Sequence, residues 1–282
     1  MTAVWRIDAG AGARLATGQA GGEPQAMLPA GVRVVDLLQP GGWDRLPELA
    51  AGGEPVPSAY RVLAPVDDQD VWAAGVTYRR SRDARLAESG QLDAYDKVYV
   101  ADRPELFWKA GPGEARGPGE TVGIRADSGW DVPEPELAVV VDASGRIVAA
   151  TIGNDVSSRS IEGENPLYLP QAKTYRYSLG LGPALVAWET LPDLMAGSVG
   201  LVIRRGGAAV FEGSVQLSEM HRQPDDLVRW LLRARDFPRG AVLLTGTGIV
   251  PDPGFTLAAG DEVRITVTGL GELVNPVEVV GA

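Results

Sequence analysis

The chain contains no cysteine and only one histidine, His221, among its 282 residues. Without cysteine it can form no disulfide, use no thiolate nucleophile and bind no cysteine-ligated zinc. One imidazole excludes a metal site built from several histidines, and a Ser-His-Asp triad would have to use His221. His221 lies in SEMHRQPDD, just before a stretch of helical composition. We therefore expect it to be a surface residue at the start of a helix.

Long apolar runs and an excess of basic residues are also missing. No apolar run reaches the roughly 18 residues of a membrane span, and the segment MTAVWRIDAG lacks the basic head and apolar core of a secretion signal. The formal net charge of −11 argues against a nucleic acid or an anionic membrane as partner. A reducing cytoplasm is the expected location, although a chain without cysteine is compatible with other compartments. An acidic substrate would need local cations.

Glycine and proline are frequent and divide the chain into a small N-terminal unit, residues 1–65, and a larger unit, residues 66–282. The first unit is expected to contain two short strands and one short helix, at residues 4–7, 32–38 and 46–51. In the larger unit apolar, β-branched runs recur, and only residues 225–235 show the pattern of a longer amphipathic helix. We therefore expect an α+β protein that is mostly β.

Residues 132–155 predict a β-hairpin. The runs at 137–141 and 147–152 are apolar and rich in β-branched residues, and DASG between them is turn chemistry. If Ser144 and Gly145 form a two-residue loop, the numbers of paired residues sum to 289. This register places Asp155 directly opposite Glu134.

Three carboxylates then meet at the open end of this hairpin. Glu134 and Glu136 are two residues apart, so on a strand their side chains project from the same face, beside Asp155. Such a cluster repels itself unless a cation binds to it, and a hard divalent ion suits carboxylate oxygens. The alternative is a solvated strand end, for which Pro135 would be suitable because it cannot donate to a ladder. We favour the metal site.

Other polar segments surround this hairpin in the sequence. Residues 157–170 are unusually polar and are expected to form a loop, and Lys173 follows them among aromatic and small residues. The run of small residues and hydroxyls at 245–248, TGTG, would let backbone N–H groups approach a ligand carboxylate. Arginines concentrate at 79–89, either on a solvated helix face or in a cationic lid extending to about residue 100.

Several of these segments together resemble the fumarylacetoacetate hydrolase superfamily. The matching signatures are PEPELAVVV, GNDVSSR, the lysine of QAKTY, LLTGTGIVP and GELVNPV, within residues 71–280. The resemblance implies a mixed β-roll with a small N-terminal domain, and a homodimer or homotetramer. It also implies that Mg²⁺, or Mn²⁺ or Ca²⁺ in its place, binds to Glu134, Glu136 and Asp155.

One departure from the family pattern separates two reactions. Members that hydrolyse C–C bonds carry a histidine and a glutamate in a short lid helix, and the corresponding residues here are Ser81 and Ala84. The strings GVTYRRSRDAR and RSIEGENPLYLPQAK look instead like the 2-keto-3-deoxy-D-arabinonate dehydratase branch. The expected activity is a metal-dependent hydro-lyase that expels the C4 hydroxyl of a 2-keto-3-deoxy sugar acid through an enolate. An acylpyruvate hydrolase, a 2-keto-acid decarboxylase and a non-catalytic binding protein are the alternatives.

The resemblance also suggests roles for individual side chains. Lys173 would contact the enolate, and Glu162 or Glu105 would transfer a proton to the leaving hydroxyl. The expected substrate contacts are Arg79, Ser81, Arg82 and Thr247.

Overall fold

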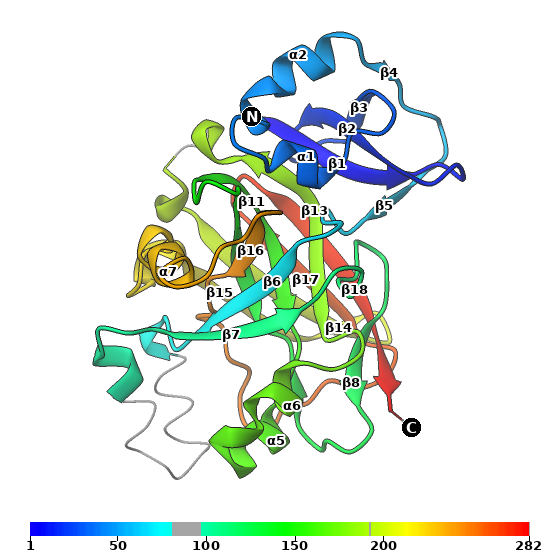
Figure 1. Cartoon of the computed structure of the whole chain (residues 1–282). Coiled ribbons are helices and arrows are strands. Elements are labelled where there is room, and N and C mark those ends of the chain that lie inside the picture. The colour runs from blue at the N-terminus through cyan, green and yellow to red at the C-terminus, as the bar shows by residue number, and fades with distance from the viewer. Residues whose placement is uncertain (81–96, 192, 282) are drawn as a thin grey trace.

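The computed structural model describes residues 1–80, 97–191 and 193–281. Its largest element is a mixed sheet in the order β4-β3-β2-β1-β13-β11-β10-β16-β6-β7, with β5 paired to β1 (Figure 1). Among the described strands of this sheet, β16 and β6 form the only parallel pair. The strands are β1 (Thr2–Asp8), β2 (Ala13–Gln19), β3 (Pro24–Met27), β4 (Glu54–Pro55), β5 (Arg61–Leu63), β6 (Asp70–Gly75), β7 (Glu105–Ala110), β10 (Pro135–Val141), β11 (Ile147–Asp155), β13 (Leu179–Ala187) and β16 (Ala241–Leu244).

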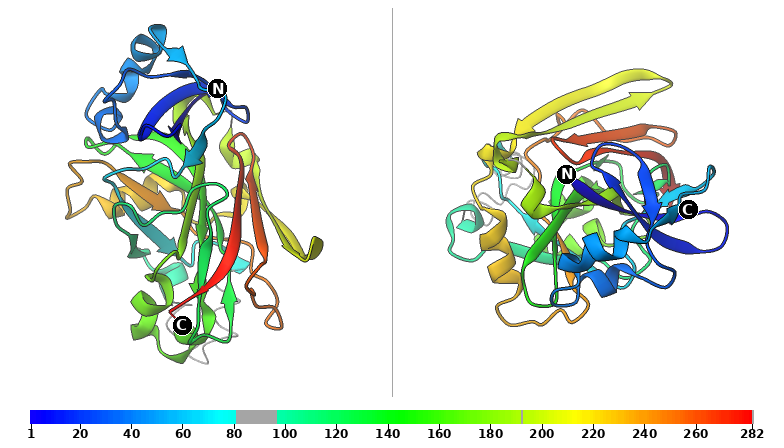
Figure 2. Two further views of the ribbon diagram at one scale, coloured as in Figure 1. Left: turned by 90° about the vertical axis from the view of Figure 1, so that its right-hand side faces the viewer. Right: turned by 90° about the horizontal axis from the view of Figure 1, so that it is seen from above.

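A second sheet, in the order β15-β14-β17-β18-β8, lies beside the main sheet (Figure 2). Its strands are β8 (Val122–Arg125), β14 (Ser198–Arg205), β15 (Ala208–Gln216), β17 (Glu262–Val267) and β18 (Gly271–Val280). A short pair joins β9 (Asp131–Val132) to β12 (Ser157–Ser158). The α-helices with described bounds are α1 (Val34–Leu37), α2 (Leu46–Ala51), α5 (Arg159–Glu164), α6 (Leu169–Lys173) and α7 (Pro224–Leu231). The predicted α+β, mostly β class is confirmed.

Strand β10 is buried on both faces. Leu137 belongs to the core shared with the second sheet, and Val139 and Val141 pack with α7. Ala138 and Val140, on the opposite face, pack with residues of α1 and the N-terminal strands. The period-2 alternation of a strand explains this division. Because apolar side chains hold β10 from both sides, the acidic residues at its start have a fixed position.

The N-terminal unit is continuous with the rest of the sheet. β1 pairs with β13, so the main sheet crosses the expected division between residues 65 and 66. The division of the chain into two domains there stays a prediction. The helix expected at 46–51 is confirmed as α2. The strand expected at 32–38 is wrong, because Val34–Leu37 forms α1. Val34, Leu37 and Leu38 are buried at helical spacing, and the carboxylate of Asp36 accepts from the backbone N–H of Arg33.

The β10–β11 hairpin has the predicted register but a different turn. Leu137 pairs with Ile152 and Pro135 with Asn154, as the sum of 289 requires. The loop is one residue longer than expected, because the N–H of Asp142 donates to the carbonyl of Arg146. Gly145 closes this loop with a φ of 90°, which is the three-residue type with a left-handed final position. A bulge at Val148 then restores the register, so the two irregularities compensate each other.

Residues 157–170 are not a loop, so this expectation is wrong. They contain β12, α5, a 3₁₀ turn at Pro166–Tyr168 and the start of α6. Ser158 caps α5 by accepting from the N–H of Ile161, and Asn165 accepts from the N–H of Leu167. These caps are recognisable helix-start signals that the polar composition of the segment obscured. Within the described ranges, no helix combines the length and the apolar character needed to cross a membrane.

Candidate active site

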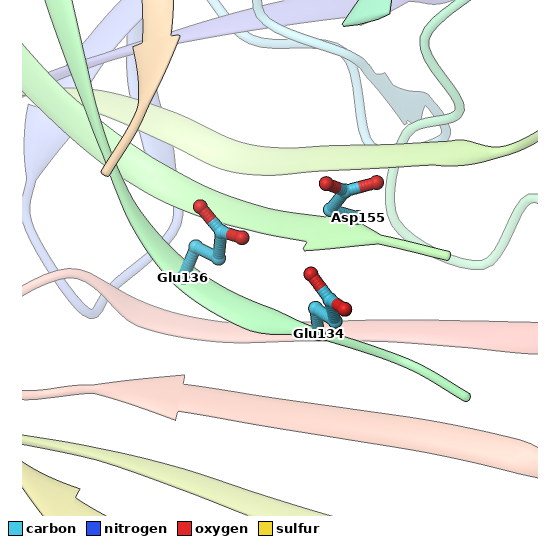
Figure 3. A group of neighbouring side chains, drawn as sticks. All are labelled: Glu134, Glu136 and Asp155. Carbon is cyan, nitrogen blue, oxygen red and sulfur yellow. The ribbon is translucent and has the colours of Figure 1, made fainter. Parts of the chain in front are cut away.

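Three carboxylates converge where β10 begins and β11 ends. Glu134 directly precedes β10, Glu136 is on β10, and Asp155 is the last residue of β11 (Figure 3). One oxygen from each lies within 4.8 Å of the other two, and all three residues are buried. The N–H of Asp155 donates to the carbonyl of Glu134 over 2.9 Å, which continues the predicted register beyond the ladder. The predicted convergence is confirmed.

The electrostatics of this cluster suit a cation. Burial, followed by the charges of Asp155 and Glu134, raises the pKa of Glu136 well above its usual value. Carboxylate oxygens are the donors that hard divalent ions prefer, and a dication among them would offset their mutual repulsion. Glu134, Glu136 and Asp155 therefore fit a divalent metal ion by both donor type and charge.

Gly246 holds one of these carboxylates. Its N–H donates to Oε2 of Glu136 over 2.5 Å. Its φ is 93°, and a Cβ at this position would lie 2.0 Å from Oγ1 of Thr77, so only glycine fits. The turn expected to bind a ligand carboxylate thus binds a carboxylate of the protein itself. The Thr247 hydroxyl exchanges hydrogen bonds with the backbone of Ile249.

Lys173 lies beside the carboxylates of Glu134 and Asp155. Its Nζ donates to Oε2 of Glu134 over 2.7 Å, to Oδ2 of Asp155 over 3.1 Å and to the hydroxyl of Ser157 over 2.6 Å. Arg159, which the sequence reasoning did not single out, forms an ion pair of 2.9 Å with Oε1 of Glu134. Both cations are buried, so they supply the local positive charge that an acidic chain needs for an anionic ligand.

A second buried lysine, Lys109, was also missed. Its Nζ is 2.5 Å from Oδ1 of Asp155, an ion pair rather than a well-directed hydrogen bond. It also donates to the carbonyls of Val156 and Lys173. Burial lowers the pKa of Lys109, and the charge of Asp155 opposes this shift. Lys109 therefore ties β7 to the end of β11 and to α6.

The scarcity of lysine is a signal that could have identified Lys109. Only three of the 26 basic residues are lysines, Lys97, Lys109 and Lys173. Two of the three are buried beside Asp155, and Lys97 is exposed. In an arginine-rich chain, lysine at a buried position indicates a site that a guanidinium would not fit.

A pocket opens beside the carboxylates. Besides Glu134, its lining includes Gly75, Glu105, Arg159, Glu162, Lys173 and Thr247. The structure therefore brings Glu105, Glu162, Lys173 and Thr247 to one pocket, and their roles stay predictions.

The other predicted contacts do not join this group. Arg79 is exposed and is not among the lining residues of the described chain. Ser81 and Arg82, with most of the expected lid at 79–100, lie outside the described residues. His221 is exposed and stacks on Tyr99 with 4.5 Å between ring centroids, consistent with the expected surface histidine.

Comparison with known proteins gives matches along most of the chain. Residues 70–278 match the family model described as "Fumarylacetoacetate (FAA) hydrolase C-terminal". A probable 2-keto-3-deoxyxylonate dehydratase of Haloferax volcanii is 47% identical over 84% of this chain and 83% of its own. A 2-dehydro-3-deoxy-D-arabinonate dehydratase of Saccharolobus solfataricus is 40% identical over 77% of this chain and 74% of its own. A solved 2-keto-3-deoxy-D-arabinonate dehydratase, complexed with magnesium and 2,5-dioxopentanoate, matches with a TM-score of 0.86, 32% identity and full coverage of both chains.

Proposed function

Because the chain belongs to the fumarylacetoacetate hydrolase family, we propose that it is a metal-dependent dehydratase of a 2-keto-3-deoxy sugar acid. One observation carries this proposal: a single pocket joins Glu134, one of the three clustered carboxylates, to Lys173, Arg159 and two further glutamates. Two relatives that match more than three quarters of the chain are named as dehydratases of such acids, one of them as a probable one, which supports the same reaction here. Magnesium is the proposed ion, because the solved relative contains it with a five-carbon keto compound.

The substrate's functional groups match the charges of the pocket. A 2-keto acid presents a carboxylate and a carbonyl oxygen side by side. A divalent ion held by Glu134, Glu136 and Asp155 would supply the positive charge that makes the C3 proton acidic. Arg159 and Lys173 add fixed positive charge where the substrate's anionic groups must bind. Lys173 donates to three acceptors, which supports its ammonium form and a role in contacting the enolate oxygen.

Elimination requires that a proton leave C3 and another reach the C4 oxygen. When the C4–O bond breaks, the enolate electrons form the C3=C4 bond and restore the C2 carbonyl, while the departing hydroxyl takes a proton to become water. Glu105 and Glu162 line the pocket: one of them, as a carboxylate, would take the C3 proton, and one of them would give a proton to the departing hydroxyl. With a pentonate, tautomerisation of the product would give the semialdehyde of 2-oxoglutarate. Arg79, Ser81 and Arg82 remain proposed contacts of the substrate hydroxyls.

The reaction can be tested by product analysis. Purified protein with Mg²⁺ is expected to convert a C5 or C6 2-keto-3-deoxy acid to a product lighter by one water, with the carbon chain intact. Chelation of the ion should stop this reaction. Cleavage of acylpyruvates such as fumarylacetoacetate is expected to be negligible, because Ser81 and Ala84 replace the hydrolytic histidine and glutamate. Mass spectrometry of both reaction mixtures shows which of the two substrates is converted and to which product. Efficient acylpyruvate hydrolysis, or release of CO₂ from the keto acid, would contradict the proposal.

The proposal includes a homodimer or homotetramer in the cytoplasm. Sedimentation analysis of the purified protein would determine the assembly.

A further inference from the structure

We propose that Gly75 is a positioning residue. Because Gly75 has no side chain, the space beside it in the pocket is open to the carboxylate of Glu105. This inference rests on the proposed dehydration and assigns the proton transfer to the leaving hydroxyl to Glu105 rather than to Glu162. Gly75 itself would touch neither substrate nor metal ion. It would act through the placement of one side chain.

The geometry of two paired strands carries the inference. Gly75 ends β6 and Glu105 begins β7, and the two residues are direct partners in this antiparallel pair. A Cβ built on Gly75 would lie 2.0 Å from Oε2, 2.7 Å from Cδ and 3.3 Å from Cγ of Glu105. Cδ and one oxygen of this carboxylate therefore lie over the Cα of Gly75. Both residues line the pocket, so this carboxylate faces the substrate space.

The backbone gives no other reason for glycine here. Gly75 is not among the described glycines with positive φ, unlike Gly246. Its strand conformation is one that alanine adopts readily, and glycine inside a strand lowers stability. The chain thus retains a destabilising residue at the one position where a methyl group would displace Glu105. Replacing Gly75 with alanine therefore tests the inference.

The two glutamates of the pocket come from different elements. Glu162 is on helix α5, whereas Glu105 is on the β6–β7 pair. A change at Gly75 therefore moves Glu105 and leaves Glu162 in place. If Glu105 gives its proton to the C4 oxygen as the C4–O bond breaks and the C3=C4 bond forms, displacing it removes the group that makes hydroxide leave as water. An acid in this role accelerates a reaction by about 10²–10⁴-fold.

Gly75→Ala is expected to lower kcat for dehydration by about 100-fold. The new methyl group meets the flexible end of a side chain rather than backbone, so Glu105 turns away and the fold persists. Affinity for Mg²⁺ should stay within error of that of the unmutated protein, and the unfolding temperature should not fall. Gly200→Ala is the matched control, because Gly200 is also a strand glycine whose Cβ would meet its cross-strand partner, Oγ1 of Thr266, at 2.7 Å. Its activity should not change.

A double-mutant cycle separates positioning from general damage. Glu105→Gln should lose about as much kcat as Gly75→Ala, and the double variant should lose no more than Glu105→Gln alone. Gly75→Ala combined with Glu162→Gln should instead show the product of the two separate losses. Unchanged turnover in Gly75→Ala, or an equal further loss when it is added to Glu105→Gln, would overturn the inference.

A crystal structure of Gly75→Ala makes the test independent of the reaction. We expect the carboxylate of Glu105 to be displaced from its place over β6, and finding it unmoved would overturn the inference. If the unmutated protein dehydrates no 2-keto-3-deoxy acid while this displacement is observed, the proposed function and the acid role of Glu105 fall. The positioning of Glu105 by Gly75 would then stand.

Discussion

Glu136→Gln is expected to weaken the binding of a divalent ion by more than about 100-fold and to stabilise the metal-free protein. Loss of a direct ligand should exceed the 10–100-fold cost of changing an outer partner. Glu136 is buried beside two other carboxylates, so its ionisation is unfavourable and its pKa is raised. A neutral amide of the same shape removes that repulsion and can still accept from the N–H of Gly246. Each 1 kcal/mol gained would raise the Tm by about 2–4 °C.

The difference in stability between metal-free Glu136→Gln and the metal-free unmutated protein depends on pH, because folding raises the pKa of Glu136. The pKa of Glu136 in the folded, metal-free protein lies above its unfolded value of 4.5. Between these two values the folded state holds more protons, so its stability falls as the pH rises. The variant has no such proton, and its advantage over the unmutated protein should therefore grow above about pH 4.5. Thermal unfolding in chelator across this range measures the effect.

Isothermal titration with Mg²⁺ or Mn²⁺ checks the predicted loss of metal affinity in Glu136→Gln. Glu212→Gln is the matched control, because Glu212 is an exposed strand residue of the second sheet. It should bind the ion as the unmutated protein does. Undiminished affinity in Glu136→Gln would remove Glu136 from the metal site.

Lys173→Met is expected to bind the metal ion normally and to lose about 10²–10⁴-fold in kcat. The ammonium of Lys173 donates to Oε2 of Glu134 and Oδ2 of Asp155, so its removal takes away a cation near the ion and should not reduce affinity. Arg159 and Lys109 still neutralise these two carboxylates, so the fold should persist. The methionine can neither hold an enolate nor exchange a proton.

Metal titration and steady-state kinetics on the same preparation of Lys173→Met test this division. Lys173→Arg is a useful companion, since it keeps the charge but changes the donor geometry, and it should not restore turnover. Full activity in Lys173→Met would show that the lysine has no part in the chemistry. Loss of metal binding in this variant would instead indicate that its role is to maintain the carboxylate site.

The carboxylate site could be predicted from the sequence because the side-chain period of a strand is 2. Counting pairs along the hairpin places Glu134 opposite Asp155, and the structure has this register. The assumed turn was nevertheless wrong, and the bulge at Val148 compensates for the longer loop. The apolar packing of β10 and β11 holds their register, and this packing is visible in the sequence as two uninterrupted apolar runs.

The rest of the site depends on contacts between distant segments. β6 pairs with β16 across more than half of the chain, and this pairing brings Gly75 to the pocket. Nothing near Gly75 in the sequence indicates that its partner is Glu105. Lys109 faces Asp155 only because the strands between them fold into one sheet. The short helices α1 and α5 were missed because four to six residues are too few for a clear period.

The distribution of lysine also determines how the protein can be modified chemically. An amine-reactive dye or surface linker attacks only an accessible, unprotonated side-chain amine, and the ammonium groups of Lys109 and Lys173 are enclosed by the sheet. Lys97 is the lysine that solvent reaches. It directly follows residues 81–96, within the stretch where the sequence predicts a lid. Among the lysine side chains, conjugation would therefore be confined to this boundary, without the replacement of any residue.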